Sequence, residues 1–253
     1  MRWLKPFLFW AVVLGIQGTL MGLSHWQWHR LSWKENAIAL RDARWASEAI
    51  PIEQALSQSR MTPDWLNVRV CGQVIPQTYA KVSYVAGLPK SAFSVVVPMT
   101  ADLGSLGNRN VLLDIGYVYF DEEMKSLPHK TLEQTSEKQC VSGHILPVSR
   151  AWGGGMGGKG QGDVYSYFDI DTMAHRWGME PFMPWVVRLD QPDALVVGPV
   201  KAYPNIPPAL RNSHLGYALT WMALAVIWPV MVWLRLKKSD KHGGKPQKQA
   251  KHP

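Results

Sequence analysis

The chain has 253 residues, of which 47% are hydrophobic, with 13 tryptophans and a formal net charge of +8. Basic and acidic residues balance over residues 30–211, so the positive excess lies at the two ends, in Arg2, Lys5 and the segment after Leu234. This distribution argues against a nucleic-acid-binding domain, and we expect the basic ends to contact the lipid bilayer instead.

Two apolar segments are long enough to cross a membrane as helices. Residues 6–28 and residues 212–234 contain no Asp, Glu, Lys or Arg, and a helix of about 20 residues spans the ~30 Å hydrocarbon core. The first apolar run is longer than that of a signal peptide, and no Ala-x-Ala site follows it, so we expect an uncleaved anchor.

The positive flanks predict the orientation of both spans. Residues 1–5 and 235–253 are expected in the cytoplasm, which places residues 29–211 in the opposite compartment. Because no Arg-rich transit segment is present, we expect a multi-pass protein of the bacterial inner membrane with a periplasmic domain.

Each predicted span contains residues that affect helix packing. Pro229 removes the helix hydrogen bond to the carbonyl of Ala225 and predicts a kink there. Gly15, Gly18 and Gly22 form a stripe of small residues, which allows close approach of the second span or of a partner helix.

The segment between the spans has the pattern of a β-rich domain. A helical continuation is expected over residues 32–49 and a short helix over residues 51–58. Asp171 is expected to cap a helix over residues 172–177, with Gly178 past its end. Strands are predicted at residues 68–71, 79–85, 93–97, 110–114, 117–120, 139–146 and 184–189. The fold class is therefore an α+β membrane protein, with two transmembrane helices flanking an antiparallel sheet or partly open barrel.

The two cysteines, Cys71 and Cys140, lie in similar local sequences, each in a strand that ends at a proline. If these strands pair, the two sulfurs can form a disulfide, which a periplasmic domain permits. Two buried thiols fit the sequence equally well. The spacing matches no metal-binding motif.

The middle domain lacks a recognisable catalytic motif. The acidic cluster Asp121-Glu122-Glu123 is expected to be a solvated turn, and His129, His144 and His175 are each expected to be exposed or locally satisfied histidines. The glycine-rich run Gly153–Gly162 lacks the Ser or Thr and the following helix of a phosphate-binding loop, so we expect a surface loop.

Three histidines lie where the predicted spans leave the membrane. His25 and His29 share one helical face at the end of the first span, and His214 begins the second span at the same level. If the helices pack together, His214 would oppose His25 or His29 as an axial pair for haem iron, with Tyr217 and Trp221 flanking the macrocycle. The alternative is an interfacial belt, in which the aromatic residues only anchor the helices at headgroup level, as expected for Trp26, Trp28, Trp33 and Trp221.

The residues around the two spans resemble a known family. The first motif is Trp26-Gln27-x-x-Arg30-x-x-x-Lys34, and the second is Asn212-x-His214-Leu215-x-Tyr217-Ala218-x-Thr220-Trp221. Together with Val68-Arg69-Val70-x-Gly72 and Gly198-Pro199, in this order and spacing, they resemble the surfeit locus protein family of cytochrome c oxidase assembly factors. One departure is Leu113-Asp114-Ile115-Gly116-Tyr117, which lacks the arginine and tryptophan of the corresponding family strand.

The resemblance implies a two-span, non-enzymatic membrane protein that helps to insert haem a into subunit I of the oxidase. Its partners would be subunit I and other oxidase assembly factors. The position of the haem-binding histidine in some bacterial members is His214 in this chain. Arg30 and Arg211, at the outer ends of the two helices, are expected to pair with the haem propionates.

Two other classes of function compete with this interpretation. A two-span periplasmic scaffold without a cofactor, similar to a polysaccharide chain-length regulator, would need long helices with coiled-coil periodicity in the domain. A membrane-anchored hydrolase would need a nucleophile and a base, and the sequence offers no recognisable pair.

Overall fold

The structure is a computed structural model that describes residues 4–58, 62–75, 78–83, 91–120, 138–148, 163–191, 195 and 200–243. The chain divides into two compact units, Met1–Ile38 with Leu210–Pro253, and Ala39–Ala209. Several sequence predictions lie outside the described residues: the end of the strand at 79–85, the Asp121–Glu123 cluster, His129, the 153–162 loop and the Gly198-Pro199 turn.

The first unit contains most of the long helix α1 (Leu4–Trp45), whose last residues belong to the second unit, and the long helix α5 (His214–Gly243). Both are apolar and long enough to cross a membrane by length and composition, and very little of either apolar stretch is buried within the structure. The helix predicted from the first apolar segment is confirmed, and it continues without a break through residues 32–45. Pro229 lies inside α5, as expected.

The two helices carry buried and half-buried residues that recur at alternating spacings of three and four. In α1 this set is Val13, Gln17, Leu20, Ser24, Gln27 and Leu31, and in α5 it is His214, Ala218, Trp221, Ala225, Trp228 and Val232. This spacing keeps one face of a helix turned towards a partner helix over many turns. We call these two sets of residues the seam.

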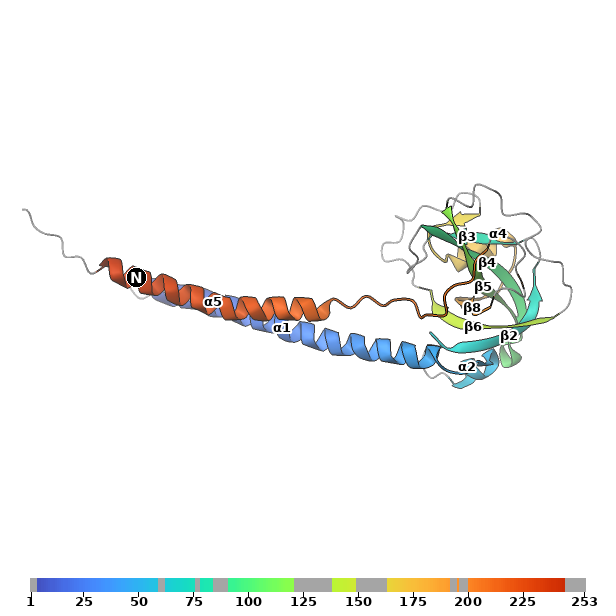
Figure 1. Cartoon of the computed structure of the whole chain (residues 1–253), viewed down its shortest axis with the longest axis horizontal. Coiled ribbons are helices and arrows are strands. Elements are labelled where there is room, and N and C mark those ends of the chain that lie inside the picture. The colour runs from blue at the N-terminus through green and yellow to red at the C-terminus, as the bar shows by residue number, and fades with distance from the viewer. Residues whose placement is uncertain are drawn as a thin grey trace, which may run out of the picture. The chain divides into compact units, whose positions relative to one another are not determined.

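The second unit is an eight-stranded sheet with short helices (Figure 1). Its strands are β1 (Ile50–Pro51), β2 (Asn67–Val74), β3 (Ala80–Val82), β4 (Ala92–Asp102), β5 (Asn108–Tyr119), β6 (Gln139–Pro147), β7 (Val164–Tyr165) and β8 (Phe182–Leu189). Its helices are α2 (Ile52–Gln58), the 3-10 turn η1 (Gly104–Leu106) and α4 (Ile170–Trp177). The predicted α+β class is thus confirmed for this unit.

Five strands of this sheet close into a ring. The pairing order runs β2, β6, β8, β5 and β4, and β4 pairs again with β2. At the closing point Gly72 approaches the backbone of Thr100 so closely that a Cβ atom would collide with the Thr100 carbonyl oxygen. The predicted partly open barrel is therefore a closed ring, from which β3 and β7 extend.

The sheet is not wholly antiparallel, as the sequence led us to expect. Strand β5 pairs in parallel with β8, and β1–β2 and β3–β7 are also parallel pairs. The two strands predicted at 110–114 and 117–120 are one continuous strand: Gly116 pairs with Val95 of β4, Asp114 pairs with Val96, and Ile115 lies at the irregularity between them. The N-cap of α4 is Asp169, whose carboxylate accepts the amide of Thr172, so the predicted cap at Asp171 is wrong.

Two apolar clusters lie on the two faces of the central strands. Val95, Val97 and Leu113 belong to the cluster inside the ring, whereas Val96 and Leu112 belong to a second cluster that α4 and β3 cover. Because successive side chains of a strand point to opposite faces, a strand that is buried on both faces must be apolar throughout. This accounts for the continuous apolar runs in β4 and β5.

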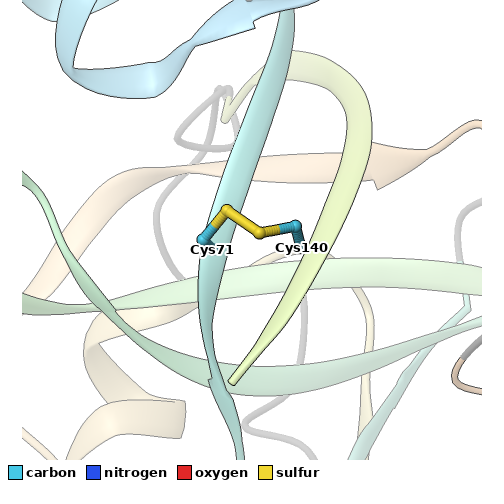
Figure 2. Close-up of a disulfide and its surroundings, with 2 residues drawn as sticks. All are labelled: Cys71 and Cys140. Carbon is cyan, nitrogen blue, oxygen red and sulfur yellow. A yellow bond between two sulfur atoms is a disulfide. The ribbon is translucent and has the colours of Figure 1, made fainter.

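The two cysteines form a disulfide between directly opposed residues of β2 and β6 (Figure 2). The Cα atoms of Cys71 and Cys140 are 4.0 Å apart, and both residues are exposed. Of the two alternatives that the sequence left open, the structure has the disulfide, and neither cysteine is a buried thiol.

Candidate functional site

Polar side chains join α1 and α5 across the seam. The Ser24 hydroxyl donates to the carbonyl of Ala218 at 3.2 Å, and the Trp228 indole donates to the carbonyl of Val13 at 3.3 Å. Because an early residue of α1 meets a late residue of α5, the two helices are antiparallel. A polar contact of this kind between apolar helices contributes about 0.6–2 kcal/mol.

A third seam contact replaces the backbone hydrogen bond that α5 loses at Pro229. Pro229 has no N–H to offer to the carbonyl of Ala225, which lies one turn earlier. The amide nitrogen of Gln17 donates to this carbonyl oxygen at 3.2 Å. The hydrogen bond lost within α5 is thus replaced by one from α1, as an apolar environment demands.

The predicted iron ligand, His214, lies at the end of the seam. Its Nδ1 is 2.8 Å from Oε1 of Gln27, a buried residue of α1 that is 8% exposed. Among the described residues, the other ring nitrogen, Nε2, has no hydrogen-bond partner. The side chain is half-buried, so His214 is held by one nitrogen and keeps the other available.

The two other histidines predicted for the site lie away from His214. His25 and His29 contact each other, with their Nε2 atoms 3.2 Å apart and their ring centroids 4.5 Å apart. Both are exposed and fall outside the seam positions of α1. The expected opposition of His214 to His25 or His29 is therefore wrong for this chain, because Gln27 occupies the seam position opposite His214.

Among the described residues, no hydrogen bond or ring contact joins the remaining predicted site residues to His214. Tyr217 is 55% exposed, and Trp221 is a half-buried seam residue one turn further along α5. The guanidinium of Arg30 lies over the ring of Trp33, 4.6 Å from its centroid, and Arg211 is exposed just before α5 begins. The roles of these residues at a ligand stay predictions.

The glycine stripe of α1 does not contribute to this packing. A Cβ atom added to Gly15, Gly18 or Gly22 would meet nothing within 4 Å. The prediction that these glycines pack against the second helix is wrong, since the polar seam residues make that contact. Their use by another protein stays a prediction.

Comparison with known proteins places the chain in a family. The model of the SURF1 family matches residues 14–226, which include the Gln17, Ser24 and Gln27 contacts of the seam. The chain belongs to the SURF1 family. The resemblance seen in the two terminal motifs is thereby confirmed.

Similar proteins of this family are found in several organisms. A "SURF1-like protein" of Caenorhabditis briggsae is 26% identical over 88% of the chain and 73% of the relative. A "SURF1-like protein" of Monosiga brevicollis is 26% identical over 93% of the chain and 90% of the relative, and "Surfeit locus protein 1" of Homo sapiens is 25% identical over 87% of the chain and 74% of the relative. The family match covers the sheet and parts of both long helices.

A buried ion pair lies in the sheet of this SURF1-family chain. The Asp114 side chain on β5 is fully buried, and its carboxylate accepts hydrogen bonds from Ser94 at 2.7 Å and from Arg188 at 2.9 Å. Asp114 belongs to the strand that departs from the family pattern, and its charge partner is supplied by β8. This pair could not be predicted from the sequence, because the two residues are far apart in the chain and their strands are parallel neighbours.

Tyr203 connects this ion pair to the segment that follows the sheet. The Arg188 guanidinium lies 3.9 Å from the centroid of the Tyr203 ring, and the Tyr203 hydroxyl donates to the carbonyl of Gly116. Gly116 has a φ of +143° and leaves no room for a Cβ atom beside Lys201, which forms a bridge with Tyr117. Glycine is therefore required where this segment lies against β5.

Burial and charge shift the pKa values of this cluster. Burial, followed by the negative charge of Asp114, raises the pKa of the Tyr203 hydroxyl well above its ordinary value. Burial alone would lower the pKa of the Arg188 guanidinium, but its interactions with Asp114 and Tyr203 together outweigh this effect and the pKa is raised. The Arg188 guanidinium thus stays charged and Tyr203 stays neutral at physiological pH.

A second buried group joins the end of α1 to the sheet. The imidazole of His144 is stacked on the Trp45 indole with centroids 3.7 Å apart, and its Nε2 is 3.0 Å from the Trp45 carbonyl oxygen. Its Nδ1 lies 2.7 Å from a carboxylate oxygen of Asp190, off the direction of a hydrogen bond, so this contact is an ion pair when the ring is protonated. His144 is thus buried, with one ring nitrogen hydrogen-bonded and the other beside a carboxylate, and it is a packing residue of the domain.

Proposed function

We propose that the chain is a non-enzymatic assembly factor of cytochrome c oxidase that carries haem a towards subunit I, together with other assembly factors. Membership of the SURF1 family supports an assembly role over an enzymatic one. The observation that carries the proposal is His214, which is held at the end of a helix seam by Nδ1 and has Nε2 without a partner among the described residues.

We further propose that α1 and α5 span a bacterial inner membrane, with both chain ends in the cytoplasm. An apolar helix in the core of a soluble protein is mostly buried, whereas these two helices expose nearly all of their apolar stretches. The positive charge beyond both spans favours cytoplasmic ends. The Cys71–Cys140 disulfide favours a periplasmic sheet domain, because disulfides persist in oxidising compartments.

The residues at the end of the seam fit haem a in their chemistry. A neutral imidazole nitrogen is a common axial ligand of haem iron, and His214 offers one beside exposed apolar side chains such as Leu215 and Tyr217. Tyr217 and Arg30 each directly precede a seam residue, so in an antiparallel pair they flank the same side of the seam. We assign Tyr217 and Trp221 to the macrocycle, and Arg30 and Arg211 to its propionates.

In this assignment His25 and His29 have no part in the iron site. They lie off the seam and contact each other. They therefore supply a matched control, because their removal also deletes imidazoles at the end of α1. Haem a is the cargo in this proposal, and the chain contributes binding and orientation rather than a chemical step.

The test is an optical spectrum of the detergent-purified protein, made in a host that synthesises haem a. We expect stoichiometric haem a in the wild type and in the double variant His25→Ala/His29→Ala, and loss of the haem bands in His214→Ala. If His214→Ala keeps both its haem and its support of oxidase activity, the ligand assignment is wrong. A colourless wild type would instead point to a docking role.

The structure gives little support to the rival scaffold function. A chain-length regulator would need long helices in the domain between the spans. In the described part of Ala39–Ala209, eight strands dominate, and the helices α2 and α4 have 7 and 8 residues.

A further inference from the structure

We infer that Gln27 is a positioning residue, which holds the His214 imidazole as the Nδ1–H tautomer and thereby keeps the Nε2 lone pair free for a metal ion. This inference rests on the proposed function, since it concerns how the same site presents its ligand. It goes further because it assigns to Gln27 of α1 a role in metal binding by His214 of α5.

The first step of the argument is the contact itself. The Nδ1 atom of His214 and Oε1 of Gln27 are 2.8 Å apart, a short distance for an N–H···O hydrogen bond. The amide of Gln27 is oriented with its oxygen towards the ring, and an amide oxygen is only an acceptor. The proton of a neutral His214 must then lie on Nδ1.

The second step is burial. Gln27 is 8% exposed and lies at a seam position of α1. Burying a polar amide between helices costs free energy unless the amide is hydrogen-bonded, so the contact with His214 stabilises both side chains in one arrangement. Without this contact, the imidazole of His214, the first residue of α5, would rotate freely about its side-chain bonds.

The third step is the chemistry of metal ligation. Histidines that bind metals almost always donate their second ring N–H to an acceptor, which fixes the tautomer and the ring orientation and makes the ligand more basic. Removing such an acceptor lowers metal affinity by about 10–100-fold. Gln27 has the position and the chemistry of this acceptor for His214.

The experiment compares three variants of the full-length protein in detergent. Gln27→Leu removes the acceptor at similar size, Gln27→Glu keeps an acceptor oxygen, and Gln17→Leu is the matched control, because it removes the other seam glutamine without touching His214. The first measurement is ¹⁵N NMR of His214 in the haem-free protein, at a pH where the imidazole is neutral. We expect the Nδ1–H tautomer in the wild type, Gln27→Glu and Gln17→Leu, and a shift towards Nε2–H in Gln27→Leu.

The second measurement is the affinity and reduction potential of the haem a complex. We expect Gln27→Leu to bind haem about 10–100-fold more weakly, and Gln17→Leu to bind within a few-fold of the wild type. Gln27→Glu should lower the reduction potential, because a carboxylate acceptor increases the basicity of the imidazole. This last readout keeps the test decisive even if Gln27→Leu does not fold.

The outcomes separate this inference from the proposed function. If His214→Ala loses haem but Gln27→Leu changes neither tautomer nor affinity, or Gln27→Glu leaves the potential unchanged, Gln27 does not position the ligand. An Nε2–H tautomer in the wild type would also overturn the inference. If His214→Ala binds haem normally, the assignment of His214 as the iron ligand in the proposed function fails, whatever the tautomer of His214.

Discussion

The buried ion pair between Asp114 and Arg188 gives the sharpest prediction about stability. The Asp114 side chain is fully buried and that of Arg188 is 12% exposed, so neither charge can be solvated if its partner is lost. Breaking one side of such a pair costs about 3–5 kcal/mol. We therefore expect Asp114→Asn to lower the free energy of unfolding by this amount, which lowers Tm by roughly 10 °C or more in a domain of this size.

The assay is thermal unfolding of the full-length protein in detergent, followed by near-UV circular dichroism. The matched control is Asp163→Asn, which breaks the ion pair with Arg176 at 3.3 Å, where both side chains are nearly half-exposed. An exposed pair is worth about 0–1 kcal/mol, so Tm should hardly change. The double variant Asp114→Leu/Arg188→Met should recover most of the lost stability, because it leaves no buried charge.

Two results of these unfolding measurements would contradict the prediction. If Asp114→Asn and Asp163→Asn lower Tm by the same small amount, the Asp114 charge is not buried in solution and the described network is wrong. If the double variant is as unstable as Asp114→Asn, the loss comes from packing rather than from the unpaired guanidinium.

Three further predictions concern other parts of the chain. The raised pKa of Tyr203 means that the folded state holds this proton more tightly than the unfolded state, so the free energy of unfolding should fall as the pH rises above about 10. Tyr203→Phe should reduce this dependence on pH in unfolding measurements at alkaline pH, and an unchanged dependence would show that Tyr203 does not cause it. Gln17→Leu should destabilise the helix pair by about 1–2 kcal/mol, because the carbonyl of Ala225 loses the side-chain donor that replaces the missing N–H of Pro229. In Pro229→Ala the same substitution should cost much less, and equal costs in both backgrounds would contradict this role of Gln17. Reduction of the Cys71–Cys140 disulfide should cost about 2–5 kcal/mol, seen as a lower Tm with reductant in the wild type but not in the double serine variant.

Much of the local structure could be predicted from the sequence, because it depends on periodicity and on local capping. The apolar segments, the runs in β2, β4, β5 and β8, and Gly178 at the end of α4 were all expected. The choice between Asp169 and Asp171 as cap was not determined locally, because both side chains lie within reach of the first turn. The cap is the residue whose carboxylate meets the amide of Thr172.

The partners that define the candidate site could not be predicted, since they are fixed by tertiary structure. His214 was singled out by its place at the start of α5, but its partner Gln27 is 187 residues away. Gln17, Ser24 and Gln27 follow one another at spacings of seven and three residues, which places them on one helical face. An apolar pattern does not reveal this face, because helices in an apolar environment can also pack through polar side chains that bind backbone carbonyls.

The pairing of the strands also limits how the sheet domain can meet another protein. Five strands close on themselves, and the two ends of the described sheet are β1 and β7, with two residues each. Within the described residues, these edges are too short to pair with a long strand of a partner. We therefore expect a partner to bind this domain through side chains on the outer surface of the ring, and the partner's binding segment need not be extended.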